Sequence, residues 1–448
     1  MTNEAVQKKR IWGWYFFDWA SQPYNTILLT FIFSPYFAEL VGDGGKAQTM
    51  WTFGQTISGL VIAFLSPILG AVADAGGKRR RWIFLFSALY FLGSYGLWWT
   101  APESFNPVWT IVIFSVGLIG MEFATNFTNS YLPELGPKEK LGRISGNGWA
   151  FGYLGGFFAL LITLLLLAER SDTGKTFLGL PPLFGLLDPT TREGTRSVGP
   201  FVALWYALFM IPFFLWVREN RSPKVTKGAV PTALRELGAT IRSLPKKPSL
   251  FAYLTSSMFY RDALNAIYGV GGVYAYGVLG WGAVDSGIFG IVAIVTGVIF
   301  TWLGGRADAK FGAKRVVVVL VFVMMIVVAA IATTSRDSVL GFAVAPDSSA
   351  PDITFYVIGA IIGAVGGALQ SASRTLMVYQ CEPGRISEGF GLYALTGKAS
   401  SFLAPWLIGM ATLLSGGNQQ IGITPLIGLF FIGLVLMIWV KPDGDLPR

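Results

Sequence analysis

The chain has 448 residues, of which 53% are hydrophobic, 15% are aromatic and only 13% are charged, whereas ordinary soluble proteins carry about 25% charged residues. This composition excludes a single soluble domain and a disordered chain, and the 55 Gly and 23 Pro exclude a coiled coil. What remains is a membrane protein. With one Cys and no His, the chain can form no intrachain disulfide, no cysteine-based metal site and no His-based acid–base relay, so we expect no metal or other cofactor.

Twelve stretches of the sequence are long and apolar enough to cross a bilayer, which takes about 20 residues of helix. Their apolar runs are continuous rather than alternating, which favours helices over a β-barrel. In chain order, the predicted spans are residues 12–37, 50–73, 82–100, 107–131, 145–168, 200–217, 249–276, 286–304, 314–333, 353–379, 389–413 and 421–440.

Lys and Arg residues predict the orientation of the spans, because they concentrate in cytoplasmic loops. The segments on the side of the N-terminus carry 26 basic residues and those on the other side carry 6, while Arg261 and Lys398 fall inside spans. Both termini are therefore expected in the cytoplasm, with the protein in a bacterial inner (plasma) membrane. The net charge of +9 follows from this bias and does not indicate a nucleic-acid partner.

Residues 218–247 divide the chain nearly in half and carry 8 basic and 2 acidic residues. Their leucines and isoleucine fall on one helical stripe, so the segment is expected either as an amphipathic helix on the membrane surface or as a solvated cytoplasmic linker. The predicted domains are residues 1–217 and 248–448, each with six spans.

The two halves of the sequence repeat one another. Three landmarks recur in the same order at offsets of 234 to 244 residues: Asp18 and Asp262, Asp74 and Asp308, and Arg143 and Arg385. Parallel repeats of six spans are the build of major facilitator transporters, which this chain therefore resembles.

The turn after the second span matches the signature loop of that superfamily, Gly-x-x-x-Asp-x-x-Gly followed by basic residues. The copy after span eight departs from it, since Gly312 lies four rather than three residues after Asp308. Glycines permit a tight turn and the carboxylate can pair with basic residues, so we expect a latch that closes one face of the transporter. A plain turn that obeys the charge bias is the alternative. The candidate gating residues are Gly70, Asp74, Gly77, Arg79, Asp308 and Arg315.

A narrower resemblance covers both halves of the chain. The sequence is similar to the unknown-major-facilitator family, which includes the autophagy-related vacuolar amino-acid effluxers. The residues that carry the resemblance are Phe17-Asp18-Trp19-Ala20, Arg143-Ile-Ser145 with Gly148, Gly152, Tyr153, Gly155 and Gly156, and Gln370-Ser-Ala-Ser373-Arg374 with Phe390, Tyr393, Gly397, Lys398 and Pro405. The resemblance implies a secondary transporter, with amino-acid export among the fungal members.

Polar side chains share one helix face in each of spans one, four, seven and ten. A charged group at a span centre costs about 2.5–3.5 kcal/mol, so it needs a function or a partner. In the major facilitator fold these four spans line the central cavity, as the resemblance implies. The candidate solute-binding residues are Gln22, Asn25, Asn126, Asn129, Arg261, Asn265, Gln370, Arg374 and, from span eleven, Lys398.

Carboxylates in these spans are the candidates for proton coupling. Burial disfavours their charged form, so Asp18 and Glu122, and next Asp262, are expected to hold protons near neutral pH. Arg261 and Lys398 can bind a substrate carboxylate or neutralise these acids, so structural ion pairs are the alternative to a zwitterion site. For Asp18, near the start of span one, a helix-start or gating role is also open.

Two glycine stripes predict close helix packing. Small residues at every fourth position let two helices approach closely. The stripes are Gly148, Gly152 and Gly156 in span five and Gly359, Gly363 and Gly367 in span ten.

These patterns predict an all-α membrane protein of the major facilitator fold, with twelve helices in two six-helix bundles. It is expected to be a monomeric secondary transporter that moves a small polar solute by alternating access, with or without proton coupling. Amino-acid export is the first reading; a sugar or drug exporter is the alternative, since the 15 Trp leave sugar stacking open. A membrane enzyme would need an acidic metal cluster or a nucleophile with its base, for which no motif is found. A non-transporting sensor would be recognised by the absence of flux.

Overall fold

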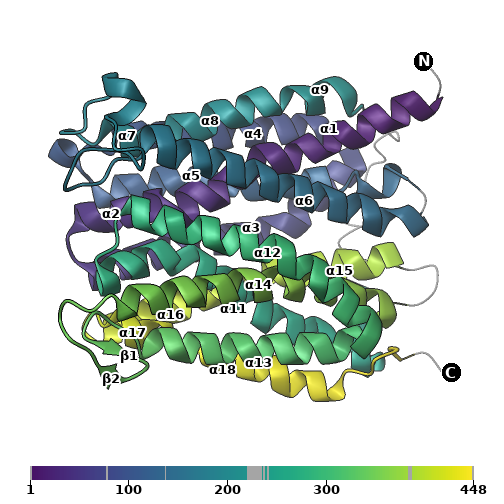
Figure 1. Ribbon diagram of the computed structural model, residues 1–448. Helices are drawn as coiled ribbons and strands as arrows, with labels where there is room; N and C mark the ends of the chain where they lie inside the picture. Colours follow the sequence, from purple (N-terminus) through teal and green to yellow (C-terminus); the bar gives the residue numbers. More distant parts are fainter. Residues whose placement is uncertain are drawn as a thin grey trace. The chain divides into compact units, whose positions relative to one another are not determined.

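The computed structural model describes residues 3–76, 79–136, 138–218, 235, 238–239, 242–381 and 386–445. Within them, helical structure covers each of the twelve predicted spans. Eight helices are long and apolar enough to cross a membrane by length and composition alone. The other predicted spans lie in α1 with η1 and α2, in α3, in α11, and in α15 with α16 (Figure 1).

The first half of the chain forms the following elements. They are α1 (Asn3–Pro23), η1 (Tyr24–Phe31), α2 (Phe33–Val41), α3 (Gly44–Gly76), α4 (Arg79–Gly96), η2 (Leu97–Trp99), η3 (Pro102–Ser104), α5 (Pro107–Asn129), η4 (Leu132–Glu134), α6 (Lys138–Ile162), η5 (Thr163–Leu167), η6 (Pro182–Gly185), α7 (Glu193–Arg196), α8 (Val198–Phe209) and α9 (Ile211–Trp216). The predicted amphipathic segment 218–247 falls largely outside the described residues.

The second half forms a similar series. Its elements are η7 (Leu244–Lys246), α11 (Pro248–Leu279), α12 (Ala283–Phe311), α13 (Ala313–Ala332), β1 (Ser338–Val339), β2 (Phe342–Ala343), α14 (Ala350–Gln380), α15 (Ile386–Ala399), α16 (Leu403–Leu414), α17 (Gln419–Ile423), α18 (Pro425–Leu436) and η8 (Met437–Trp439). The two short strands pair antiparallel as a hairpin between α13 and α14 (Figure 1).

The chain forms two compact units, and each is described by itself. Unit 1 comprises Met1–Val41, Phe64–Leu234 and Trp281–Gly287, and unit 2 comprises Gly42–Ala63, Arg235–Gly280 and Ile288–Arg448. Thus the first part of α3 packs with the second half of the chain, and the start of α12 packs with the first half. The division at residues 217 and 248 stays a prediction.

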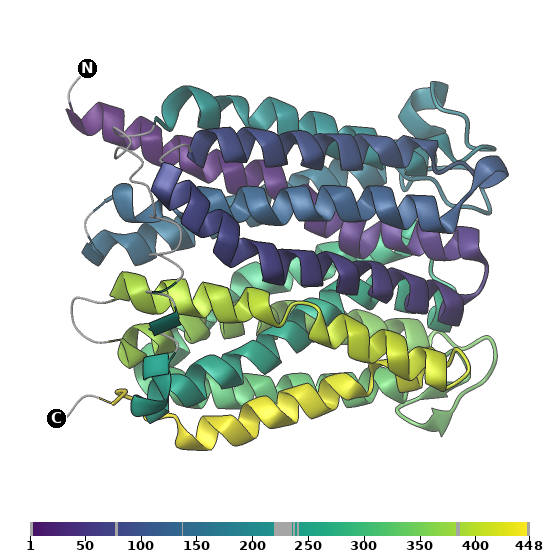
Figure 2. The ribbon, with the colours of Figure 1, turned by 180° about the vertical axis from the view of Figure 1, so that it is seen from behind.

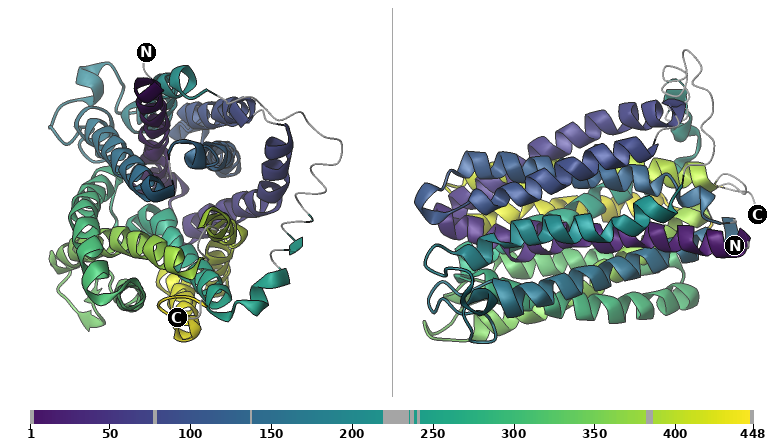
Figure 3. Two further views of the ribbon diagram at one scale, coloured as in Figure 1. Left: turned by 90° about the vertical axis from the view of Figure 1, so that its right-hand side faces the viewer. Right: turned by 90° about the horizontal axis from the view of Figure 1, so that it is seen from above.

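Helices run side by side within each unit. In unit 1, α1 packs on α6, α8 and α9, and α4 packs on α5 and α8 (Figure 2). In unit 2, α11 packs on α14, α15 and α18, and α13 packs on α14 and α18. Viewed from the end, each unit is a bundle of roughly parallel helices (Figure 3, left).

Glycines set the closest helix contacts, as the two stripes predict. A Cβ at Gly152 of α6 would lie 3.0 Å from the Cβ of Asp18, and one at Gly148 would lie 2.6 Å from the Trp14 ring, both on α1. In unit 2, a Cβ at Gly363 of α14 would lie 2.0 Å from the carbonyl oxygen of Ala293 on α12. The small-residue stripes therefore join α1 to α6 and α14 to α12.

Predicted span one is interrupted at a proline. Because Pro23 has no N–H, the carbonyl of Trp19 one turn earlier loses its helical donor. The indole Nε1–H of Trp205 on α8 donates to that carbonyl at 3.2 Å, and the two indole rings stack. Beyond Pro23 the chain continues as the π-helical turn η1 and then as α2. A partner from another helix thus compensates the interruption.

Candidate functional site

Predicted span eleven is also interrupted, and the interruption lies against α11. The helix α15 ends at Ala399, and α16 begins at Leu403. Pro405 explains the break, because it cannot donate to the carbonyl of Ser401 and would clash with it in a continuous helix. In the first turn of α16 its missing N–H costs nothing, since no intrahelical acceptor is available there.

Asp262 holds the start of the second half-helix. Its Oδ2 accepts a hydrogen bond of 2.9 Å from the backbone N–H of Ala404, the second residue of α16. The side chain comes from α11 and is buried, with an exposed fraction of 4% for the residue. A carboxylate in this place acts as a helix cap supplied by another helix, and its charge is favourable beside the positive end of the helix dipole. This predicted proton carrier therefore also has a structural function.

Arg261 and Lys398 lie at the other side of the break. The Arg261 guanidinium stacks over the Tyr393 ring of α15, 4.0 Å from its centroid, and donates to the Tyr393 carbonyl at 3.0 Å. Gly397 makes room for it, since a Cβ there would lie 2.9 Å from the guanidinium nitrogens. Lys398 follows Gly397 in the last turn of α15, where a helix C-terminus favours a cation. The interruption thus brings the adjacent Arg261 and Asp262 of α11 beside the segment that contains Lys398, which is distant in the sequence.

The predicted polar face of α14 packs beside α11 in the same unit. Ser373 of α14 exchanges a 2.8 Å hydrogen bond with the Tyr260 hydroxyl, and its carbonyl accepts one from the Tyr253 hydroxyl. Its neighbours Gln370 and Arg374 are half-buried, and Asn265 of α11 is exposed. Within the described residues, neither Gln370 nor Asn265 forms a side-chain hydrogen bond.

In unit 1, the predicted residues of α1 face α6. Asp18 and Gln22 are half-buried, and the glycine stripe of α6 brings backbone to within reach of both: a Cβ at Gly156 would lie 2.8 Å from Cγ of Gln22. Asn25 lies in the π-helical turn η1, and its side chain is half-buried. Within the part of the chain that the structure describes, the side-chain amides of Gln22 and Asn25 form no hydrogen bond.

The predicted residues of α5 are less uniform. Glu122 and Asn126 are half-buried, and Asn126 donates to the hydroxyl of Ser66 on α3 at 3.2 Å. Asn129 is exposed at the last residue of α5. Glu122 and Asn126 thus belong to one half-buried face, while Asn129 lies at its edge.

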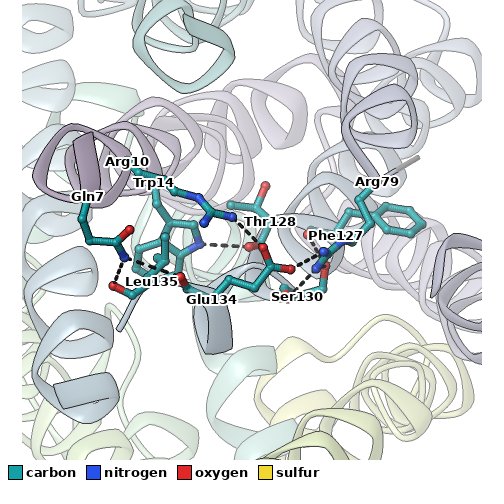
Figure 4. A network of polar contacts seen from close by, with 9 residues as sticks. All are labelled: Gln7, Arg10, Trp14, Arg79, Phe127, Thr128, Ser130, Glu134 and Leu135. Atoms are coloured by element: carbon teal, nitrogen blue, oxygen red, sulfur yellow. Dashed lines mark hydrogen bonds and ion pairs between the residues drawn. The ribbon is translucent and has the colours of Figure 1, made fainter. Parts of the chain in front are cut away.

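The first gating turn has a partner that the sequence analysis missed. Arg79, the first residue of α4, pairs with Glu134 at the end of η4, and Arg10 of α1 pairs with the other oxygen of the same carboxylate at 2.6 Å. Figure 4 shows the two arginines reaching Glu134 from opposite sides. Burial raises the pKa of the Glu134 carboxyl, but the hydrogen bonds from Arg79 and Arg10 outweigh it and hold the pKa below its usual value.

Glu134 therefore links three elements of unit 1. Gln7 strengthens the junction by donating to the carbonyl of Leu135 at 2.5 Å, and the Trp14 indole donates to the carbonyl of Thr128 at 2.9 Å (Figure 4). One signal in the sequence could have indicated this junction: Glu134 is an acid in a loop that the charge bias predicts to be basic.

The second gating turn is built differently. Gly312 ends it with a φ of 83°, a left-handed backbone that suits glycine, and its N–H donates to the carbonyl of Asp308. Arg315 is exposed, and the described residues contain no ion pair between it and Asp308. Gly77 of the first turn lies outside the described residues, as do the surroundings of Gly70 and the side chain of Asp74. The same holds for the side chains of Arg143, Ser145, Arg385 and Phe390.

Among the residues that the structure describes, no three His, Cys, Asp or Glu side chains gather as metal ligands would. The acids and bases found here instead meet helix ends and one another.

Comparisons with known proteins show which family and fold this chain resembles. The family described as "Vacuole effluxer Atg22 like" matches residues 44–444. An uncharacterized MFS-type transporter of Bacillus subtilis, YxiO, is 25% identical over 96% of this chain and 94% of its own length. Autophagy-related protein 22-1 of Aspergillus niger is 24% identical over 60% of this chain, which spans 42% of that relative.

Solved structures of similar fold are membrane transporters. A D-xylose–proton symporter superposes with a TM-score of 0.65 at 14% identity, covering 99% of both chains. A bacterial homologue of the lysosomal transporter Spinster gives 0.64 at 14% identity over both full chains, and a variant of the nucleoside transporter NupG gives 0.62 at 12% identity over 97% of this chain and 99% of its own. At these identities the similarity establishes the fold and not the solute.

Proposed function

Because this chain belongs to the Atg22-like family of major facilitator membrane transporters, which confirms the predicted family and fold, we propose that it exports a small zwitterionic solute, an amino acid, by alternating access. The family description names an effluxer, which supports export as the direction. The fungal relatives are about twice as long as the part that this chain matches, so their activity supports the proposal only for the shared membrane region.

The observation that carries the proposal is the cluster at the interrupted helix of unit 2. The Arg261 guanidinium and the Lys398 ammonium offer two cations to a solute carboxylate. Discontinuous helices with charged ends are a common way for transporters to bind charged groups within a membrane. The amides of Asn265 and Gln370, on the helices packed beside this cluster, can complete the polar contacts.

Asp262 is occupied by the N–H of Ala404, so we assign proton coupling to Asp18 and Glu122 of unit 1, which are half-buried. Gln22, Asn25, Asn126 and Asn129 are the neutral polar groups of the same unit in the proposal. A carboxylate that takes up a proton when the solute leaves would couple export to a proton gradient.

The proposal places the protein in the bacterial plasma membrane as a monomer. Both termini would lie in the cytoplasm, as the excess of Lys and Arg predicts. In this orientation the Arg79–Glu134–Arg10 junction lies on the cytoplasmic side of unit 1.

Counterflow in proteoliposomes tests the proposal. Vesicles loaded with an unlabelled pool of amino acids should accumulate an external labelled amino acid, and vesicles loaded with sugars should not. Arg261→Gln and Lys398→Gln should lose this exchange, while Lys46→Gln, which removes an exposed cation without an ion pair among the described residues, should retain it. Exchange of sugars with no exchange of amino acids would overturn the proposal, as would full exchange by both charge-removing variants.

A further inference from the structure

A carboxylate with no exposed surface lies at the end of unit 1 opposite the Glu134 junction. Glu169 follows the π-helical turn η5, and its exposed fraction is 0%. Its Oε1 accepts a hydrogen bond of 3.0 Å from the Thr195 hydroxyl and lies 3.6 Å from a guanidinium nitrogen of Arg192. Its Oε2 has no hydrogen-bond partner.

The same arginine serves a second acid. Arg192 contacts Oε2 of Glu39, at the end of α2, at 2.9 Å, and donates to the backbone carbonyl of Glu169 at 3.1 Å. Arg192 adopts a φ of 57°, a left-handed conformation that is unusual for a residue other than glycine, so the surroundings hold it in place. One guanidinium thus stands between two carboxylates.

Within the described residues, Arg192 is the one cation that contacts Glu169. The nearby Arg196 pairs with Glu193 at 3.2 Å, and the adjacent Arg170 pairs with Asp285 at 3.0 Å. The other ionisable groups around the cluster are Glu39 and Tyr36, whose ring lies 5.6 Å from the Arg192 guanidinium. Two deprotonated acids would therefore leave excess negative charge where water is excluded, which is costly.

The unpaired oxygen of Glu169 faces a backbone acceptor. The position that a Cβ would take at Gly194 lies 1.9 Å from Oε2 of Glu169 and 2.2 Å from the carbonyl oxygen of Leu167. The two oxygens therefore lie at most 4.1 Å apart, with Gly194 packed against both. Two acceptors repel one another unless a hydrogen lies between them.

We propose that Glu169 is a proton-binding site, with the proton on Oε2 and donated to the carbonyl of Leu167. The ligand is the proton itself, and the site lies outside the polar faces of α1, α5, α11 and α14. The inference does not depend on the identity of the transported solute. Burial also raises the pKa of the Glu169 carboxyl and that of Glu39, and the charge of Arg192 only partly opposes the rise.

The Glu169 site connects several segments at this end of unit 1. Through Arg192 it joins α2 to the segment before α8, and the adjacent Arg170 forms an ion pair of 3.0 Å with Asp285 in the first turn of α12. Loss of the proton would leave Glu169 charged beside Glu39 and weaken the junction. Proton binding at Glu169 would then stabilise the packed arrangement of this end of unit 1.

Infrared titration of the full-length protein in nanodiscs tests the site directly. The wild type should show the carbonyl stretch of a protonated acid at pH values where an exposed Glu is already ionised. Glu169→Gln should lose this band and still fold, because its amide N–H₂ can donate to Leu167 as the protonated acid does. Glu103→Gln, which changes an exposed acid, should retain the band.

The second variant keeps the test valid if Glu169→Gln fails to fold. Glu39→Gln removes the competing charge on Arg192, so the Glu169 band should vanish at a pH lower by about one unit. Thermal unfolding provides a second measurement. Because the pKa of Glu169 is raised in the folded protein, its contribution to stability is fully present below its unfolded-state pKa. This contribution is lost as pH rises through its folded-state pKa. This loss of stability with rising pH should be absent in Glu169→Gln. An infrared band that is unchanged in both variants would overturn the proposal. A loss of stability that follows the Na⁺ concentration at constant pH would also overturn it.

Discussion

Asp262 of α11 and Ala404 of α16 are joined by a hydrogen bond of 2.9 Å from the Ala404 N–H to the Asp262 carboxylate. This contact bears on whether Asp262 can carry a proton. An acid whose oxygen caps a helix cannot take up a proton without weakening the cap. The charge of Asp262 and the break in span eleven are therefore parts of one feature, since the freed N–H groups of α16 need an acceptor.

Substitutions at Asp262 separate the cap from the charge. Asp262→Asn retains an oxygen that can accept from Ala404, so it should fold with a small loss of stability. Asp262→Ala leaves a buried N–H unsatisfied and should lower the free energy of unfolding by about 1–3 kcal/mol. Thermal unfolding in detergent measures both. Equal destabilisation by the two variants would show that the hydrogen bond contributes little.

The break itself was not predictable from apolar content. Residues 389–413 carry one charged residue, Lys398, and a few polar ones such as Ser400 and Ser401, so the hydropathy averaged over the stretch predicts one helix. Pro405 alone does not locate the break, because prolines also occur in continuous, kinked transmembrane helices. The partner Asp262 is distant in the chain, and only the tertiary packing shows which N–H group it caps. By contrast, the glycine stripes were predictable because they depend on spacing within one helix.

The contact between α1 and α6 gives a stability prediction. Gly152→Leu should destabilise unit 1 by about 1–3 kcal/mol, because a Cβ there already lies 3.0 Å from the Cβ of Asp18 and a larger side chain forces the helices apart. Gly146→Leu is the matched control on the same helix, since nothing lies within 4 Å of its Cβ position. Thermal unfolding compares the two. Similar melting temperatures would contradict close packing at Gly152.

Acids near the ends of the predicted spans escaped the sequence analysis for a different reason. Glu39, Glu134 and Glu169 lie just beyond those spans rather than inside a periodic pattern, and their arginine partners come from distant segments. Arg10 and Glu134 are 124 residues apart, and Arg192 and Glu39 are 153 apart. Charge bias predicts that arginines occur in a loop, but it carries no information on which acid each one meets.

The Glu134 junction predicts measurable coupling between its residues. In a double-mutant cycle, Arg10→Gln and Glu134→Gln should show an interaction energy of about 0.5–3 kcal/mol, because both groups share one half-buried network. The pKa of Glu134 is lowered in the folded protein, so its contribution is present above the unfolded-state value, about 4.3, and is lost as pH falls through the folded value. Additive effects in the cycle would exclude a functional ion pair.

Asp18 and Glu122 provide the test of proton coupling. Asp18→Asn and Glu122→Gln should abolish solute flux driven by a pH gradient, since the amides cannot bind and release protons, yet preserve exchange of solute at equal pH. Glu103→Gln, an exposed acid, should leave both activities intact. Proteoliposome flux with and without an imposed gradient measures the difference. If both amide variants retain pH-driven flux, proton coupling does not pass through these carboxylates, and a facilitated export of the solute down its own gradient becomes the better account of the α1 and α5 faces.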